Sequence, residues 1–145
     1  MISKFKLLDN QYKIINGTTV YRIQALKSFG NVKAGEIGGW VQKEDNLSQT
    51  GNCWIFDDAL VLDDARIMGD SQIMGHVKIN GNVRVSDKAQ ILGKVSITGN
   101  VHIYGEPIIR GTAKIRDYVK ISGNTEISGA PEIWDNAFIF GNAKV

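Results

Sequence analysis

The sequence predicts an all-β fold: a parallel β-helix with three six-residue repeats in each coil, preceded by a small N-terminal β-hairpin cap. Two observations predict the β-helix. Residues 51–145 divide into fifteen complete hexads and five further residues without an insertion. The fifth position of every block is Ile or Val, from Ile55 to Val145, and the first position is always Gly or Asp. A fixed period of this kind indicates a solenoid more strongly than any local propensity.

The spacing within a hexad explains the architecture. Positions three and five are two residues apart, so on a strand they point to the same face, and position four points to the other. Position one is a corner, where Gly, and less easily Asp, accepts unusual backbone angles. One strand cannot bury its apolar face alone, but three strands that close a triangle can. Eighteen residues then make one coil, and successive coils stack about 4.8 Å apart as parallel strands.

Residues 1–50 are predicted to form the cap, and residues 51–145 the β-helix. Residues 12–23 are typical of a hairpin that turns at Asn16-Gly17. The Gly-rich stretch 30–39 is predicted to be a loop. The segments 39–44 and 45–50 continue the hexads in register, with Lys43 and Gln49 at the Ile position. Degenerate, polar repeats of this kind are typical of a solenoid's terminal cap.

The hexads resemble the left-handed β-helix of the bacterial hexapeptide-repeat superfamily. Gly38-Gly39-Trp40, residues 44–48 and Gly51-Asn52-Cys53-Trp54 resemble the cap junction of the uncharacterised YdcK-like proteins of bacteria and their phages. The resemblance implies the left-handed path, against the general preference for right-handed crossovers. For function it implies only the transferase activity of the wider fold, and a fold does not confer function.

Two histidines are the candidates for catalysis. Acyltransferases of this superfamily use a catalytic His beside a coenzyme cleft and a loop extruded from a coil, but no loop interrupts these coils. His76 and His102 fall on different faces of the predicted prism, and either could act as a general base. A zinc site like that of the superfamily's carbonic anhydrases needs three His ligands. We therefore expect no metal and no cofactor, and Cys53, at an inward position, is expected to be a buried thiol.

One column of side chains on the predicted β-helix is basic. Position four of every third hexad reads Arg66, Arg84, His102 and Lys120, each eighteen residues from the next. These residues should stack on one face, with Tyr104 and Tyr118 nearby. The column indicates an anion-binding strip for an acidic partner, nucleotide or nucleic-acid backbone. The alternative is an ordinary solvated face, because Asp64 and Asp117 lie close to it in the repeat.

Apolar residues at outward positions predict contacts beyond the repeat itself. Those near its start, Trp54 to Met74, are expected to lie under residues 1–30. The last coil is expected to form a homo-oligomer interface, as an end-to-end dimer or, alternatively, as the side-by-side trimer usual for the fold. The residues predicted for that interface are Trp134, Phe138, Ile139, Phe140 and Val145.

Composition narrows the class of protein. The formal net charge of +2 is too weak to argue for nucleic acid by itself, and nucleic acid is not the expected partner. The N-terminus lacks the pattern of a signal peptide and no stretch has transmembrane length, so a cytoplasmic protein without membrane contact is expected. The sequence favours a non-enzymatic binding or structural module, encoded by a phage or mobile element, that presents a rigid face to a protein partner. The alternatives are an acyl-CoA-dependent hexapeptide acyltransferase and a polyanion-binding protein.

Overall fold

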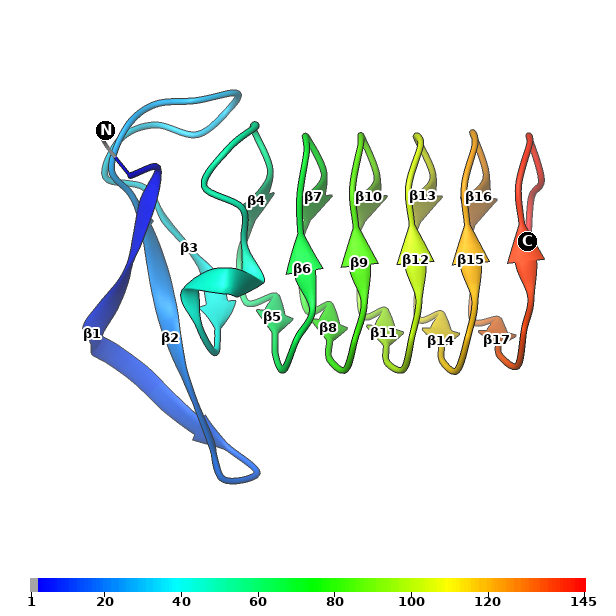
Figure 1. Cartoon of the computed structure of the whole chain (residues 1–145), viewed down its shortest axis with the longest axis horizontal. Helices are drawn as coiled ribbons and strands as arrows, with labels where there is room; N and C mark the ends of the chain where they lie inside the picture. The colour runs from blue at the N-terminus through cyan, green and yellow to red at the C-terminus, as the bar shows by residue number, and fades with distance from the viewer. Residues whose placement is uncertain (1–2) are drawn as a thin grey trace.

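A computed structural model describes residues 3–145 as an all-β protein with one short 3-10 helix, η1 (Glu44–Asn46). The cap contributes β1 (Phe5–Ile15), β2 (Thr18–Ala25) and β3 (Ile37–Val41). The β-helix contributes fifteen two-residue strands, each formed by positions four and five of one hexad. Figure 1 shows the cap at one end of a stack of similar coils. The predicted solenoid of three hexads per coil is therefore confirmed.

The strands form three sheets, one on each side of the prism. The first sheet has the order β1-β2-β3-β5-β8-β11-β14-β17. Its strands that belong to the β-helix are β5 (Leu60–Val61), β8 (Lys78–Ile79), β11 (Ser96–Ile97), β14 (Lys114–Ile115) and β17 (Glu132–Ile133). The second sheet holds β4 (Trp54–Ile55), β7 (Gln72–Ile73), β10 (Gln90–Ile91), β13 (Ile108–Ile109) and β16 (Glu126–Ile127). The third sheet holds β6 (Arg66–Ile67), β9 (Arg84–Val85), β12 (His102–Ile103), β15 (Lys120–Ile121) and β18 (Phe138–Ile139).

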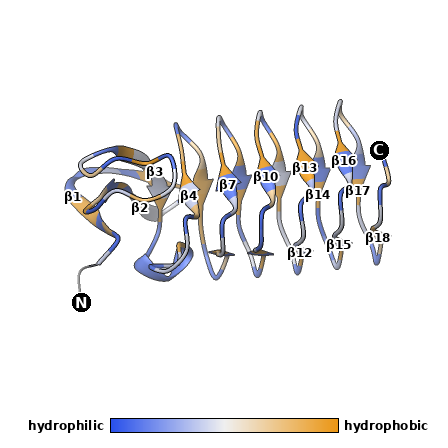
Figure 2. Cartoon of the chain, turned by 90° about the horizontal axis from the view of Figure 1, so that it is seen from above, coloured by the Kyte–Doolittle hydropathy of each residue, from blue (hydrophilic) through white to orange (hydrophobic). Residues whose placement is uncertain are grey.

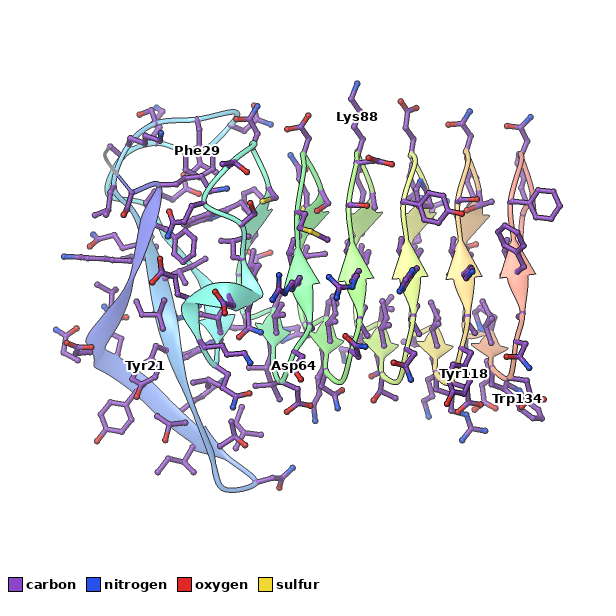
Figure 3. All side chains as sticks on the ribbon, viewed as in Figure 1. Tyr21, Phe29, Asp64, Lys88, Tyr118 and Trp134 are labelled. Carbon is purple, nitrogen blue, oxygen red and sulfur yellow. The ribbon has the colours of Figure 1, made fainter. Side chains whose placement is uncertain are left out.

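The coils follow a left-handed path. In Figure 1 the strands of the third sheet lie in front and run upward, while successive coils advance from the cap toward the right. The first and third sheets meet at the lower edge of this view, and the third and second sheets meet at the upper edge. Figure 3 shows Asp64 at the lower edge and Lys88 at the upper one. The corner between the first and third sheets is called the lower edge, and the corner between the third and second sheets is called the upper edge.

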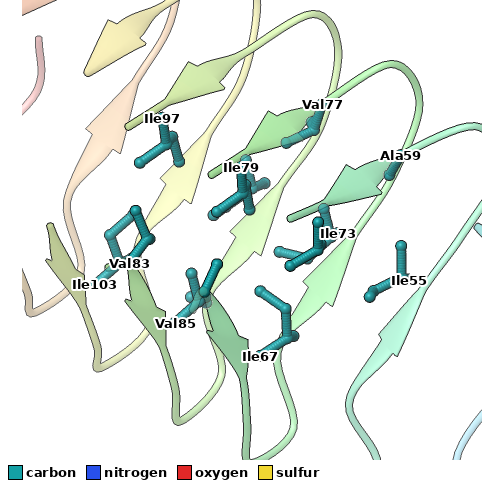
Figure 4. Close-up of a cluster of buried hydrophobic side chains, with 14 of the residues drawn as sticks. Ile55, Ala59, Ile67, Ile73, Val77, Ile79, Val83, Val85, Ile97 and Ile103 are labelled. Atoms are coloured by element: carbon teal, nitrogen blue, oxygen red, sulfur yellow. The ribbon is translucent and has the colours of Figure 1, made fainter. Parts of the chain in front are cut away.

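The core consists of three columns of Ile and Val from position five. Ile67, Val85 and Ile103 succeed one another in parallel register in the third sheet, and all three are fully buried. Figure 4 shows these side chains in rows inside the coils. Position three adds smaller buried residues such as Ala59, Ala65 and Val77. Apolar burial in continuous columns is what stabilises strands too short to be stable alone.

The corners have the strained backbone that the repeat predicts. Every position-one residue from Gly51 to Gly141 has a positive φ. Five of these residues are Asp, and four of the five, such as Asp57 and Asp87, accept a backbone N–H of the next coil through Oδ2. The Asp87 contact joins Oδ2 to the Gly105 nitrogen at 2.8 Å. Asp at a corner therefore offsets part of its backbone strain with a hydrogen bond that Gly cannot make.

The predicted hairpin is present and covers the first coil. β1 pairs antiparallel with β2, and Asn16 and Gly17 at the turn have φ of 49° and 83°. The edge of Trp54 is packed by Phe5 and Phe29, whose ring centroids lie 6.4 and 5.4 Å from that of Trp54. Figure 2 shows β1, β2 and β3 lying beside β4 at the N-terminal end of the stack. The expected cover over the outward apolar residues is thus confirmed for Trp54, which is fully buried.

The predicted register of the cap repeats is wrong by two residues. Val41 pairs with Val61, and Leu47 forms a parallel bridge to Ile67. Val41 and Leu47 therefore occupy the inward position five that was predicted for Lys43 and Gln49. Both apolar residues are buried. The cap repeats are therefore not polar at their inward position, and two extra residues, 49–50, separate them from the regular array.

The stretch 30–39 is not all loop, because residues 37–39 belong to β3. Gly38 and Gly39 are there because the strand passes very close to the first coil. A Cβ on Gly39 would lie 2.5 Å from the Ala59 carbonyl oxygen, and a Cβ on Gly38 would lie 2.6 Å from that of Ile55. These glycines thus mark a close approach of two backbones and not a flexible loop. No helix within residues 3–145 is long and apolar enough to cross a membrane.

Candidate functional site

The predicted basic column lies on the third sheet. Arg66 pairs in register with Arg84, Arg84 with His102, and His102 with Lys120. All four side chains are exposed. Strand spacing in a sheet is about 4.8 Å, so the column places its side chains at regular steps along the rigid β-helix. The next member of the column is Phe138, which is also exposed.

Two acidic residues near the column, Asp64 and Asp117, are already engaged. The Asp64 carboxylate forms an ion pair with Lys43 Nζ at 2.7 Å, and Lys43 lowers the pKa of Asp64. Asp117 Oδ2 accepts the backbone N–H of Asp135 at 3.0 Å. Within residues 3–145 the ion pairs are Lys43–Asp64 and Arg22–Asp58, both in contact with the cap. Arg66, Arg84 and Lys120 therefore present their charges to solvent without an ion-pair partner.

Stacked cations favour an anionic ligand. Two unit charges about 5 Å apart repel by about 1 kcal/mol even in bulk water. The hydrogen bonds between coils fix the backbone spacing of Arg66 and Arg84, so the repulsion is relieved only by side-chain movement or by bound anions. The Asn82 side chain donates to Asn100 Oδ1 at 3.1 Å beside this column, which adds uncharged polar groups to the same face.

The two histidines lie apart. His102 is on the third sheet, and His76 is at the corner that leads into the first sheet. Both side chains are exposed, and neither has a side-chain hydrogen bond among the residues described. Neither lines the cavity beside Lys4 or the cavities beside Arg66, Lys88 and Arg116. Within one chain these histidines thus have neither an orienting partner nor an enclosed site.

The residues predicted for self-association are divided among different sides of the last coil. The rings of Phe138 and Phe140 lie together, with centroids 4.8 Å apart, and both are more than half exposed. Trp134 instead lies near the lower edge, under the Arg116 guanidinium. Ile139 points inward and is half-buried. Val145 follows on the second-sheet side, where its N–H donates to Glu126 O.

Cys53 is a buried free thiol with an unexpected neighbour. The Lys4 side chain is 1% exposed, and its Nζ donates to the Cys53 carbonyl at 2.9 Å and lies 3.4 Å from Sγ. Burial lowers the pKa of Lys4, and burial raises the pKa of the Cys53 thiol. Lys4 also donates to Gly51 O at 3.3 Å, so the ammonium joins the N-terminal strand to the first coil. This pair is structural, because the thiol is held away from solvent.

A cavity of about 540 Å³ lies beside Lys4 at the junction of the cap and the first coil. Phe29, Lys27 and Thr50 are among its lining residues. The buried Lys4 ammonium is already engaged by backbone carbonyls, so it is not free to bind a ligand in this cavity. The cavity is therefore a gap in the fit of the cap and does not form a candidate site.

A second group of cations, which was not predicted from the sequence, lies on the first sheet. Lys78 and Lys114 both pair in register with Ser96, and Lys114 is exposed. Arg116 follows at the lower edge. The missed signal was present in the repeat, because Lys78 and Lys114 share position four of the hexads that form the first sheet. Two of the three sides of the prism are therefore basic, which the net charge of +2 does not reveal.

Comparison with known proteins gives a partial likeness. No family model matches the chain. Over 40 residues, which are 28% of this chain, the sequence is 45% identical to the uncharacterised acetyltransferase YdcK of Escherichia coli (strain K12). The matched segment covers 12% of that protein. The hexads and the left-handed β-helix fit the hexapeptide-repeat superfamily, in agreement with the resemblance seen in the sequence.

Proposed function

We propose that this chain is a binding module whose third sheet holds an acidic protein partner. The observation that carries the proposal is the register of Arg66, Arg84, His102 and Lys120 on a rigid face, with three charges that lack ion-pair partners. A preformed face loses little conformational entropy on binding, which favours affinity. A phage or mobile-element origin stays a proposal.

Charge reversal tests the proposal. Poly-L-glutamate serves as the acidic probe, and the test variant replaces Arg66, Arg84 and Lys120 by Glu. We expect binding to be lost while the thermal midpoint changes little, because exposed charges contribute little to stability. The matched control replaces Lys6, Lys33 and Lys88 by Glu, which changes the net charge equally but leaves the column intact. Equal loss in both variants would show that net charge, and not the column, binds the probe.

A second candidate function is acyl transfer from acyl-CoA. The likeness to an acetyltransferase and the place of His102 between Arg84 and Lys120 favour it. The two cations could hold the coenzyme's phosphates while His102 acts as general base. Calorimetric titration with acetyl-CoA distinguishes the candidates. Saturable micromolar binding that His102→Ala abolishes would support the acyltransferase, and the absence of heat would support the binding module.

A further inference from the structure

Two exposed aromatic rings and three cations meet at the lower edge of the β-helix. Tyr118 and Trp134 are 62% and 48% exposed. Figure 3 shows both rings at this edge, on neighbouring coils. Lys114 and Arg116 approach from the first sheet and Lys120 from the third. These five residues are called the edge site below.

The aromatic rings of the edge site do not serve the core. Ile133 and Val119, next to Trp134 and Tyr118 in the chain, are the residues that point inward and are buried. The Arg116 guanidinium lies 5.4 Å from the centre of the Trp134 ring, which holds one side of that ring by a cation–π contact. A large ring that is half exposed and already oriented is a surface on which another flat group can stack.

Three carboxylates lie around the edge site beside its cations, namely Glu132, Asp117 and Asp135, which follows Trp134 in the chain. Glu132 pairs in register with Lys114 in the first sheet, but the two side chains form no ion pair within residues 3–145. Asp117 is held by a backbone N–H of the next coil. None of the three cations forms an ion pair within residues 3–145, so each can bind an anionic group that passes along the edge. Further cations are Lys78 in β8 of the first sheet and Lys94, which precedes β11 of the same sheet.

We infer that the edge site binds single-stranded nucleic acid. Such a ligand needs a cationic track for its phosphates and aromatic side chains on which unpaired bases stack, and the edge site supplies both within two coils. A duplex keeps its bases stacked internally and offers the rings no partner. An acidic polymer without bases would use the cations and leave Tyr118 and Trp134 unused. The inference does not depend on the proposed function, with which it shares Lys120 alone.

Fluorescence anisotropy with a labelled oligothymidylate tests the inference. Stacking contributes enough that Trp134→Ala and Tyr118→Ala should each weaken binding about tenfold. The logarithm of the affinity should fall against the logarithm of salt concentration with a slope of roughly −2, for three neutralised phosphates. Tyr104→Ala is the matched control, because Tyr104 is 38% exposed near the opposite edge of the third sheet. That variant should bind as tightly as the wild type, and circular dichroism should show all three variants folded.

Tryptophan fluorescence supplies a second measurement. Trp54 is buried and Trp40 is half-buried, so a bound base should quench the fluorescence of Trp134. The fraction of total tryptophan emission that oligothymidylate quenches should therefore fall to zero in Trp134→Phe. Poly-L-glutamate should not quench it. No binding of oligothymidylate, or equal binding by wild type and Trp134→Ala, would overturn the inference. Tighter, Trp134-dependent binding of an acidic polysaccharide such as hyaluronate would overturn it in favour of a sugar ligand.

Discussion

Each corner of the β-helix places one residue in the left-handed region, and the neighbouring coil decides what fits there. Gly99 has φ of 96°, and a Cβ at this position would lie 2.7 Å from the Asp117 nitrogen and oxygen. We expect Gly99→Ala to lower the free energy of unfolding by roughly 2–4 kcal/mol, through backbone strain and the displaced corner. Urea denaturation measures this change.

Gly129 provides the matched control for that substitution. Its φ is 73°, but a Cβ would have no neighbour within 4 Å. Gly129→Ala should therefore cost only the backbone strain, about 1–2 kcal/mol. If the two variants lose the same stability, close packing between corners does not contribute and this account of the glycines is wrong.

Lys4 and Cys53 predict opposite responses to alkaline pH. The Cys53 pKa is raised above 9.0 by burial, so its contribution to stability is complete below pH 9.0 and is lost as pH rises through the raised value. Burial lowers the Lys4 pKa of the folded chain below the ordinary value of 10.5. Between the lowered pKa and 10.5 the unfolded chain binds more protons than the folded chain, so stability rises with pH. The free energy of unfolding therefore falls with pH through Cys53 and rises with pH through Lys4.

Substitution separates these two slopes. Cys53→Ala removes the alkaline loss, so its stability relative to wild type should improve as pH rises above 9.0. Lys4→Met removes the opposite slope, so its stability relative to wild type should decline as pH rises toward 10.5. Urea denaturation at a series of pH values measures both differences. Curves that run parallel to the wild type in both variants would contradict the assigned pKa directions.

Aromatic packing stabilises the junction between the cap and the first coil. Trp54 on β4 is fully buried between Phe5 of β1 and Phe29. We expect Trp54→Ala to lower the free energy of unfolding by about 3–5 kcal/mol, because a large cavity opens under the cap. The same substitution at Trp134, which is 48% exposed, should cost less than about 1 kcal/mol. Equal losses at the two positions would show that the cap does not depend on this packing.

Most of the β-helix was predictable from sequence, and the cap was predictable only in outline. Position five of each hexad is Ile or Val without exception, so the inward face and the eighteen-residue register follow directly from the period. The cap repeats were misplaced because Val41 and Leu47 are separated from the array by two extra residues. A six-residue period carried backward from Gly51 cannot detect such a shift.

The candidate site was predictable to a similar degree. The column Arg66, Arg84, His102 and Lys120 followed from counting, because residues eighteen apart share a face. The contact between Arg116 and Trp134 did not follow, since it depends on how two long side chains turn at an edge. The engagement of Asp64 by Lys43 also depends on the cap, whose register the sequence did not reveal.

The whole molecule is predicted to self-associate through its last coil. Phe138 and Phe140 form an exposed apolar pair on the last coil, which supports an interface between two copies of the chain. We expect light scattering at tens of micromolar to show a homo-oligomer, as an end-to-end dimer or a trimer. Phe138→Glu, on the flank, and Ile139→Lys, in the inward layer, should dissociate the end-to-end dimer. A monomeric wild type, or two variants that both stay oligomeric, would contradict the end-to-end arrangement.

The proposed function requires that the third sheet is a preformed basic face that binds acidic ligands. The most direct measurement is the affinity for poly-L-glutamate across a salt series, for the wild type and for the variant with Arg66, Arg84 and Lys120 replaced by Glu. We expect the wild-type affinity to fall steeply as salt rises, because charges at the surface are screened within about 10 Å at 0.1 M salt. We also expect no binding by the variant at any salt concentration. Salt-independent binding by the wild type, or retained binding by the variant, would contradict the proposed function.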